Sequence, residues 1–150
     1  AHSLRQTCPD FSGMLALVVD DNASSRSVLV DLLGACSMQV AEADSGAAAL
    51  DWLAHPHKAG AVDLILIDSR MPVMDGAEAV RRIKLSKTLS SNTRILMLLA
   101  RGDDDSTRPA SELGVDVILV KPVEPSRLLD ALSNVWHGSS GDPGGKGFSV

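Results

Sequence analysis

The sequence contains no tyrosine, and its two phenylalanines and two tryptophans bring the aromatic content to only 3%. Because 45% of the residues are still hydrophobic, we expect a core of Val, Leu, Ile and Ala side chains. There are two cysteines, Cys8 and Cys36, and their spacing does not match a metal-binding motif. We therefore expect free thiols, as in a cytosolic protein, and no disulfide.

Basic residues are also few, since 14 Lys and Arg against 19 Asp and Glu give a formal net charge of −5. A nucleic-acid-binding surface would be basic, so the composition argues against that class of protein. No apolar run approaches the ~20 residues of a membrane span, and no signal-peptide pattern opens the chain. The 150 residues suit one cytoplasmic domain with a sizeable core and no membrane contact.

What the sequence does contain is a run of four apolar residues, 64–67, that ends abruptly at Asp68. The run is too short for a confident helix and suits a strand buried on both faces of a parallel sheet. Pro72 and the pair Asp75-Gly76 then predict a loop before the next helix. Asp68 is either a residue of a solvated turn or a ligand at the carboxyl end of a central strand.

Two further apolar runs end in charged residues. Residues 15–19 are followed by Asp20 and Asp21, and residues 115–120 are followed by Lys121. If these runs are parallel neighbours of the run before Asp68, three carboxylates and one ammonium meet at one sheet edge. Such a group of anions is expected to hold a cation. Oxygen ligands without His or Cys favour Mg²⁺ over zinc.

The rest of the chain alternates strand and helix signals. In the first predicted helix, which starts at Asn22 or Ala23, Val28, Leu29, Leu32 and Leu33 form the apolar face and Gly34 suits the end. The other predicted strands cover 38–43 and 94–99, and the other predicted helices follow Ser45, cover 77–87, begin near Arg108 or Pro109, and begin at Pro125. Five strands alternating with five helices predict an α/β fold with a doubly wound, mostly parallel sheet.

Three motifs in this order resemble a known family. They are VVDDN at 18–22, LILIDSRMPVMDG at 64–76 and LVKPV at 119–123, and they resemble the receiver domain of two-component response regulators. VVDDNASSR at 18–26, together with 112–132, is most similar to receivers of hybrid sensor histidine kinases. The resemblance runs from about Met14 to Trp136 and implies a flavodoxin-like fold with strand order 2-1-3-4-5.

The resemblance also implies a role for each charged residue. Asp68 would accept a phosphoryl group from a phosphohistidine. Asp21 and Asp68 would bind Mg²⁺ directly, Asp20 mainly through water, and Arg70 through its backbone carbonyl. Lys121 would pair with Asp68 and then with the phosphoryl group, and the peptide bond after it is cis in the family.

Other positions around the phosphoryl group depart from the family pattern. Receivers usually place Thr or Ser where Leu99 stands, and Tyr or Phe where Ile118 stands. We therefore expect the phosphorylation chemistry to survive and the usual hydroxyl–aromatic switch to be absent. Ala100, Arg70 and Arg101 would surround the phosphoryl group. The two arginines either replace the contact that Leu99 cannot make or are solvent-facing loop residues.

The predicted function is that of a phosphoacceptor receiver domain, which catalyses its own aspartyl phosphorylation within a hybrid histidine kinase. Its partner would be a histidine kinase or a histidine phosphotransfer domain. One alternative is a degenerate receiver that binds partners without phosphorylation. Another is an aspartyl-phosphate hydrolase, although Asn22 stands where that chemistry needs a second Asp. A dinucleotide-binding domain would need a glycine-rich loop after the first strand.

The ends of the chain differ in composition from the middle. Residues 1–13 are expected to be a linker or a remnant of cloning, and residues 14–137 to form the receiver domain. Residues 138–150 are rich in Gly and Ser and are expected to be a flexible tail. The sequence leaves the oligomeric state open.

Overall fold

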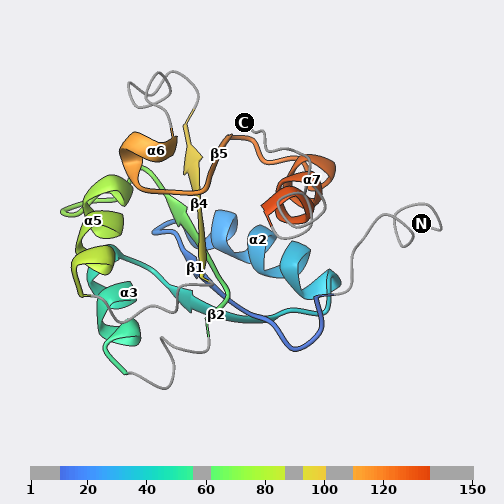
Figure 1. Ribbon diagram of the computed structural model, residues 1–150, viewed down its shortest axis with the longest axis horizontal. Helices are drawn as coiled ribbons and strands as arrows, with labels where there is room; N and C mark the ends of the chain where they lie inside the picture. The colour runs from blue at the N-terminus through green and yellow to red at the C-terminus, as the bar shows by residue number, and fades with distance from the viewer. Residues whose placement is uncertain (1–10, 56–61, 87–92, 101–109, 136–150) are drawn as a thin grey trace, which may run out of the picture.

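The computed structural model describes residues 11–55, 62–86, 93–100 and 110–135. Its centre is a sheet of five parallel strands in the order β2-β1-β3-β4-β5 (Figure 1). The strands are β1 (Leu15–Val19), β2 (Gln39–Ala43), β3 (Leu64–Asp68), β4 (Arg94–Leu99) and β5 (Val117–Val120). The predicted strand order and the predicted flavodoxin-like α/β class are both confirmed.

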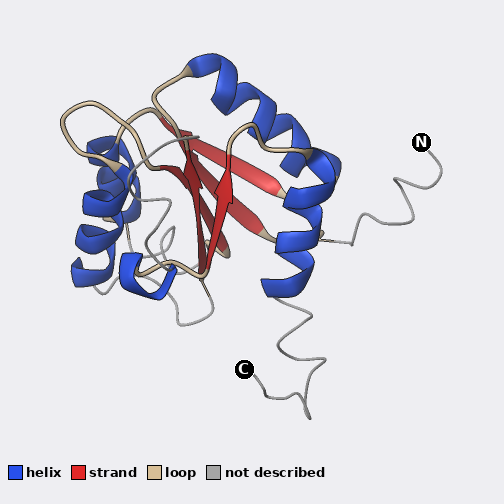
Figure 2. Cartoon of the chain, turned by 90° about the horizontal axis from the view of Figure 1, so that it is seen from above, coloured by secondary structure: helices blue, strands red, loops and turns tan. Residues whose placement is uncertain are grey.

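Helices cover both faces of this sheet. They are α2 (Ala23–Ala35), α3 (Gly46–Leu53), α5 (Gly76–Ser86), α6 (Ala110–Leu113) and α7 (Pro125–Ser133). Figure 2 shows α2 and α7 on one side of the strands and the other three helices on the opposite side. Within the described ranges, no helix has the length and apolar character that crossing a membrane requires.

The central strand β3 separates two halves of the core. Its residues Ile65 and Ile67 pack on the side of α3 and α5, whereas Leu64 and Leu66 pack on the side of α2 and α7. All four side chains have 0% exposure. The strand is therefore buried on both faces, as its uninterrupted apolar sequence predicts.

The sheet register brings three strand ends to the same edge. Val19 of β1 pairs with Ile67 of β3, so the residues that follow them, Asp20 and Asp68, emerge side by side. On the other side of β3, β4 pairs with β5 up to Leu99 and Val120, which places Lys121 at the same edge.

Helix α2 starts where the sequence predicts but faces the core differently. The side chain of Asn22 caps it by accepting a hydrogen bond from the Ser25 amide. Leu29, Leu33 and Cys36 point into the core, whereas Val28 is 56% exposed. The predicted inward position of Val28 is wrong. The buried residues 29, 33 and 36 are spaced four and three positions apart, so the core-facing side of the helix begins one residue after Val28.

The packed part of the chain begins before the expected domain boundary. Phe11 is 1% exposed and packs with the core residues between the sheet and α2. Its amide donates a hydrogen bond to the carbonyl of Cys36. The expectation that residues up to Gly13 are only a linker is therefore wrong for Phe11, since this side chain fills part of an aliphatic core.

The last two helices differ in how far they are described. Within the described residues α6 covers Ala110–Leu113, and its expected start near Arg108 or Pro109 lies outside them. Helix α7 begins at Pro125, as predicted, and buries Leu128 and Leu132. Strand β5 begins two residues later than its apolar run, at Val117.

Candidate metal centre

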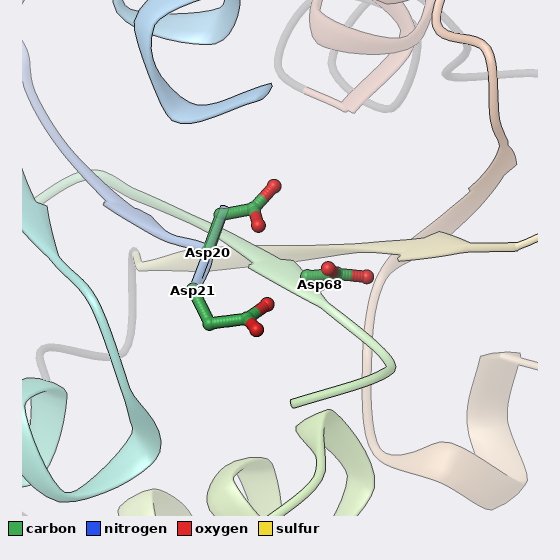
Figure 3. A group of neighbouring side chains, drawn as sticks. All are labelled: Asp20, Asp21 and Asp68. Atoms are coloured by element: carbon green, nitrogen blue, oxygen red, sulfur yellow. The ribbon is translucent and has the colours of Figure 1, made fainter. Parts of the chain in front are cut away.

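Three carboxylates converge at the carboxyl edge of the sheet. Asp20 and Asp21 follow β1, and Asp68 ends β3; Figure 3 shows their side chains gathered at this edge. One oxygen of each lies within 4.8 Å of the others. Asp20 is fully buried and Asp68 is 5% exposed, whereas Asp21 is exposed. The predicted juxtaposition of the three aspartates is confirmed.

The buried carboxylate of Asp20 is only half satisfied within the protein. Its Oδ1 accepts a hydrogen bond from the Asn22 amide at 2.9 Å. Among the described residues no donor forms a hydrogen bond with its buried Oδ2, and the nearest cation is Lys121 Nζ at 3.6 Å. A buried carboxylate oxygen without a donor is costly. The group therefore fits a hard cation that prefers oxygen ligands, such as Mg²⁺.

The contacts and the burial of Asp68 shift its pKa in opposite directions. Its Oδ2 lies 3.2 Å from Lys121 Nζ, and its Oδ1 accepts a hydrogen bond from the Arg70 amide at 3.3 Å. Burial raises the pKa of Asp68 above its usual range, and the charge of Asp20 acts in the same direction. The attraction of Lys121 and the Arg70 hydrogen bond oppose this rise in pKa without cancelling it.

Lys121 directly follows the last residue of β5, and the pairing of this strand fixes its position. Its amide donates to the carbonyl of Leu99 at 2.8 Å, and its side chain, 27% exposed, reaches both Asp20 and Asp68. The peptide bond between Lys121 and Pro122 is cis, as the family resemblance implies. One ammonium thus faces two buried carboxylates, which leaves the site negatively charged.

The loop after Asp68 depends on a close backbone approach. The Gly76 amide donates to the carbonyl of Ser69 at 2.9 Å. A Cβ atom added at Gly76 would lie 2.8 Å from Ser69 Cα and still closer to the carbonyl oxygen of Asp68. The sequence marks Gly76 as a turn residue, but its contact with the strand that carries Asp68 is evident only in the structure.

The structure describes most, but not all, of the residues expected around the phosphoryl group. The side chain of Arg70 is exposed, and Arg101 lies outside the described residues. Leu99 is 1% exposed and belongs to the core beside α3 and α5, and Ile118 packs against the same core. Leu99 and Ile118 are thus aliphatic core residues at the positions where receivers usually carry a hydroxyl and an aromatic ring.

A mostly apolar cavity of about 490 Å³ opens beside Lys121. It lies between the first half of α2 and the segment that follows β5, and its lining includes Val28, Leu29, Ala100, Lys121, Pro122 and Val123. Ala100 therefore borders the site on this side. The sequence did not predict this cavity, because it placed Val28 in the core.

Sequence reasoning also missed Arg26 and Glu42. Arg26 Nη1 donates to the main-chain carbonyl of Asp20 at 2.7 Å, and Arg26 Nε donates to Glu42 Oε1 at 3.0 Å. Arg26 lies within the segment 18–26 that resembles the family, but Glu42 is 16 residues away. No local pattern links the two residues.

Comparison with known proteins identifies the family. The response regulator receiver domain model matches residues 16–133, and the chain belongs to this family. The chemotaxis protein CheY of Bacillus subtilis is 34% identical over 122 residues, covering 81% of this chain and 96% of CheY. The structure of CheY4 from Vibrio cholerae is 32% identical with a TM-score of 0.70, and the match covers 83% of this chain and 99% of that chain.

Receivers within larger sensor proteins are also similar. The autoinducer 2 sensor kinase/phosphatase LuxQ of Vibrio vulnificus is 32% identical over 120 residues, which cover 80% of this chain and 13% of LuxQ. The chain thus spans nearly the whole length of some relatives and only 13% to 32% of others.

The family membership defines what the domain does. It is a receiver domain of two-component signalling, and receivers of this family bind Mg²⁺ at a group of acidic residues. They interact with histidine kinases or phosphotransfer proteins. The alternatives considered from the sequence, a degenerate interaction module and an aspartyl-phosphate hydrolase, are not favoured by these findings.

Proposed function

We propose that Asp68 is the phosphoacceptor of this domain. One carboxylate oxygen of Asp68 attacks the phosphorus of a partner's phosphohistidine, and the bond between phosphorus and the imidazole nitrogen breaks. The electron pair of that bond stays on the imidazole, and Asp68 becomes an acyl phosphate. The observation that carries this proposal is the position of Asp68 at the strand end, between two other aspartates and one lysine.

The same carboxylates are the proposed ligands of Mg²⁺. Asp21 and Asp68 would bind the ion directly, Asp20 mainly through water, and Arg70 through its main-chain carbonyl. The unsatisfied Oδ2 of Asp20 and the oxygen-only surroundings support this choice of ion. When bound, Mg²⁺ supplies positive charge that offsets the negative charge of the transferring phosphoryl group.

Lys121 has two successive partners in this proposal. Before transfer its ammonium pairs with Asp68 Oδ2 at 3.2 Å and keeps the carboxylate oriented at the sheet edge. After transfer the ammonium would bind a phosphoryl oxygen instead. Ala100, which borders the site, leaves room for that group because its side chain is a single methyl.

The test is phosphorylation by a small phosphodonor with Mg²⁺, followed by mass spectrometry of the intact protein. One phosphoryl group should add to the wild type and none to Asp68→Asn. Asp51→Asn changes an exposed aspartate of α3 and serves as the control, which should be phosphorylated like the wild type. Addition to Asp68→Asn would place the acceptor elsewhere, and no addition to the wild type would favour the degenerate module.

For the whole protein, we propose that this domain is the receiver of a hybrid sensor kinase located in the cytoplasm. Support comes from the similarity to receivers that make up a small part of sensor kinases. The net charge of −5 supports a protein partner rather than a nucleic acid.

A further inference from the structure

The main chain of Asp20 is held from two sides. Its amide donates a hydrogen bond to the carbonyl of Ala43 in β2 at 3.1 Å. Its carbonyl accepts a hydrogen bond from Arg26 Nη1 at 2.7 Å. Both contacts act on the residue that begins the acidic segment after β1, so they determine where Asp20 and its neighbour Asp21 can lie.

Arg26 links three elements through one guanidinium group. Its own amide donates to the carbonyl of Asn22 in the first turn of α2. Its side chain, 19% exposed, turns back to Asp20 and pairs with Glu42, which lies opposite Val18 in the register of β1 and β2. Arg26 therefore joins the end of β1, the start of α2 and the neighbouring strand.

The positive charge of Arg26 near the start of α2 is unfavourable unless an anion lies beside it. The first turns of a helix carry partial positive charge, which repels the guanidinium of Arg26. Glu42 offsets that repulsion at 3.0 Å. The planar fork of arginine can donate to Asp20 and Glu42 at the same time, which the single ammonium group of lysine cannot do with the same geometry.

We propose that Arg26 is a positioning residue of the metal centre. Without a bound cation, Asp20, Asp21 and Asp68 repel one another, and the segment after β1 is the part that can move away. The bond from Arg26 to the Asp20 carbonyl holds this segment in place, so that the carboxylates are already arranged for Mg²⁺. The inference rests on the proposed Mg²⁺ site.

Two effects of Arg26 on Mg²⁺ affinity have opposite signs. Its positive charge repels the ion, so removing it would strengthen binding. Its hydrogen bond holds the ligands, so removing it would weaken binding. Because Glu42 lies beside the guanidinium and offsets its charge, we expect the loss of positioning to dominate. Loss of such supporting contacts typically weakens metal binding by about 10-fold or more.

The experiment measures Mg²⁺ affinity by calorimetry, at a temperature where every variant is folded. Arg26→Met should bind Mg²⁺ about 10-fold more weakly than the wild type. Arg26→Lys should also bind more weakly, because it keeps the charge and loses the fork. Arg82→Met removes a more exposed arginine of α5, which also pairs with a glutamate, and should leave the affinity unchanged.

A second measurement needs no metal. Amide hydrogen exchange in the presence of a chelator reports on Asp20 and Asn22, whose amides are both hydrogen-bonded in the segment that Arg26 holds. These two amides should exchange faster in Arg26→Met, while amides in the centre of β3 keep their protection. A merely structural loss of stability would accelerate exchange in both places.

The outcomes separate this inference from the proposed site. Asp21→Ala should abolish Mg²⁺ binding in the same assay. If Asp21→Ala abolishes binding while Arg26→Met binds as tightly as the wild type or more tightly, only the role of Arg26 is overturned. If the wild type binds no Mg²⁺, or Asp21→Ala binds it normally, the proposed site and this inference are both wrong.

Discussion

At the scale of single residues, the site places charge where it destabilises the folded chain. Asp20 and Asp68 are buried, and Lys121 faces both of them. Replacing either aspartate by a neutral residue removes repulsion but also removes a proposed Mg²⁺ ligand. Binding sites commonly trade stability for function in this way.

The first prediction uses the raised pKa of Asp68. Because this pKa is higher in the folded than in the unfolded protein, the folded protein holds the proton more tightly. The stability of the metal-free wild type should therefore fall as the pH rises through the raised pKa of Asp68. In a chelator at neutral pH, Asp68→Asn should melt at a higher temperature than the wild type.

The measurement is thermal unfolding of both proteins between neutral pH and the ordinary pKa of aspartate. The advantage of Asp68→Asn should shrink as the pH falls, since the wild-type carboxyl becomes protonated. Asp51→Asn, at an exposed position, is the control and should show no such trend. A lower melting temperature for Asp68→Asn at neutral pH would mean that the pair with Lys121 outweighs burial.

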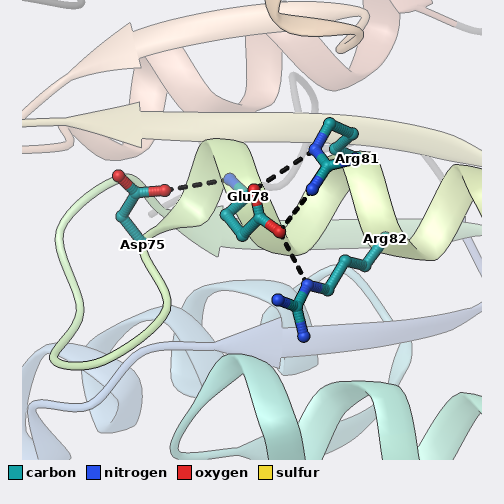
Figure 4. Close-up of polar contacts among 4 residues, drawn as sticks. All are labelled: Asp75, Glu78, Arg81 and Arg82. Carbon is teal, nitrogen blue, oxygen red and sulfur yellow. Dashed lines mark hydrogen bonds and ion pairs between the residues drawn. The ribbon is translucent and has the colours of Figure 1, made fainter.

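At the scale of elements, the connection from β3 to α5 contains the backbone contacts that fix the position of Asp68. Asp75 Oδ1 accepts a hydrogen bond from the Glu78 amide at 2.9 Å and so caps α5 (Figure 4). Glu78 in turn pairs with Arg81 and Arg82, and these hydrogen bonds lower the pKa of Glu78. Exposed pairs of this kind contribute little stability. The position of the loop after Asp68 therefore depends more on the Asp75 cap and on the close approach of Gly76 to the backbone of Asp68 than on these ion pairs.

The element-scale prediction is a Gly76→Ala substitution. The new Cβ would collide with the backbone of Asp68 and Ser69, so the loop or the strand end must move. We expect a loss of about 1–3 kcal/mol in unfolding free energy, typical of overpacking. Phosphorylation by the small donor should also slow, because the displaced backbone carries Asp68, the proposed acceptor.

Gly34→Ala is the matched control for this prediction. Gly34 lies inside α2, and an added Cβ there meets no atom within 4 Å. Alanine should stabilise the helix by about 0.5–1 kcal/mol and leave phosphorylation unchanged. Urea unfolding and the phosphorylation rate measure both effects. Wild-type behaviour of Gly76→Ala in both assays would contradict the predicted collision.

At the scale of the whole molecule, the apolar cavity shares Lys121 with the acidic site, and this lysine pairs with Asp68. A small phosphodonor needs only the acidic site, whereas a histidine on a protein must bring its surrounding surface with it. Val28, 56% exposed, lines this cavity and offers an apolar contact to such a surface. We therefore expect α2 to take part in docking the phosphohistidine partner.

The corresponding prediction separates the two donors. Val28→Asp should slow transfer from a phosphohistidine partner by about 10-fold, the effect of losing a central interface residue. It should leave phosphorylation by a small donor unchanged. Leu85→Asp changes an exposed apolar residue of α5, on the opposite face of the sheet, and should affect neither reaction. Equal slowing with both donors would place Val28 within the chemistry instead of the docking surface.

Much of the fold follows from local features of the sequence. The apolar runs before Asp20, Asp68 and Lys121 predicted three strands that end at one edge, and Asn22 and Ser45 predicted two helix starts. These signals are local, because strand burial, helix caps and turns depend on residues a few positions apart. The strand order came from the family resemblance and is confirmed by the structure.

The contacts that complete the site were decided by tertiary structure. Arg26 meets Glu42 because β1 and β2 pair in one particular register, and Gly76 meets Asp68 because the loop folds back on its own strand. The exposure of Val28 depends on how α2 is rotated against the sheet. Such contacts join residues by packing rather than by sequence spacing, so the sequence determined which groups reach the site and the tertiary structure determined what holds them there.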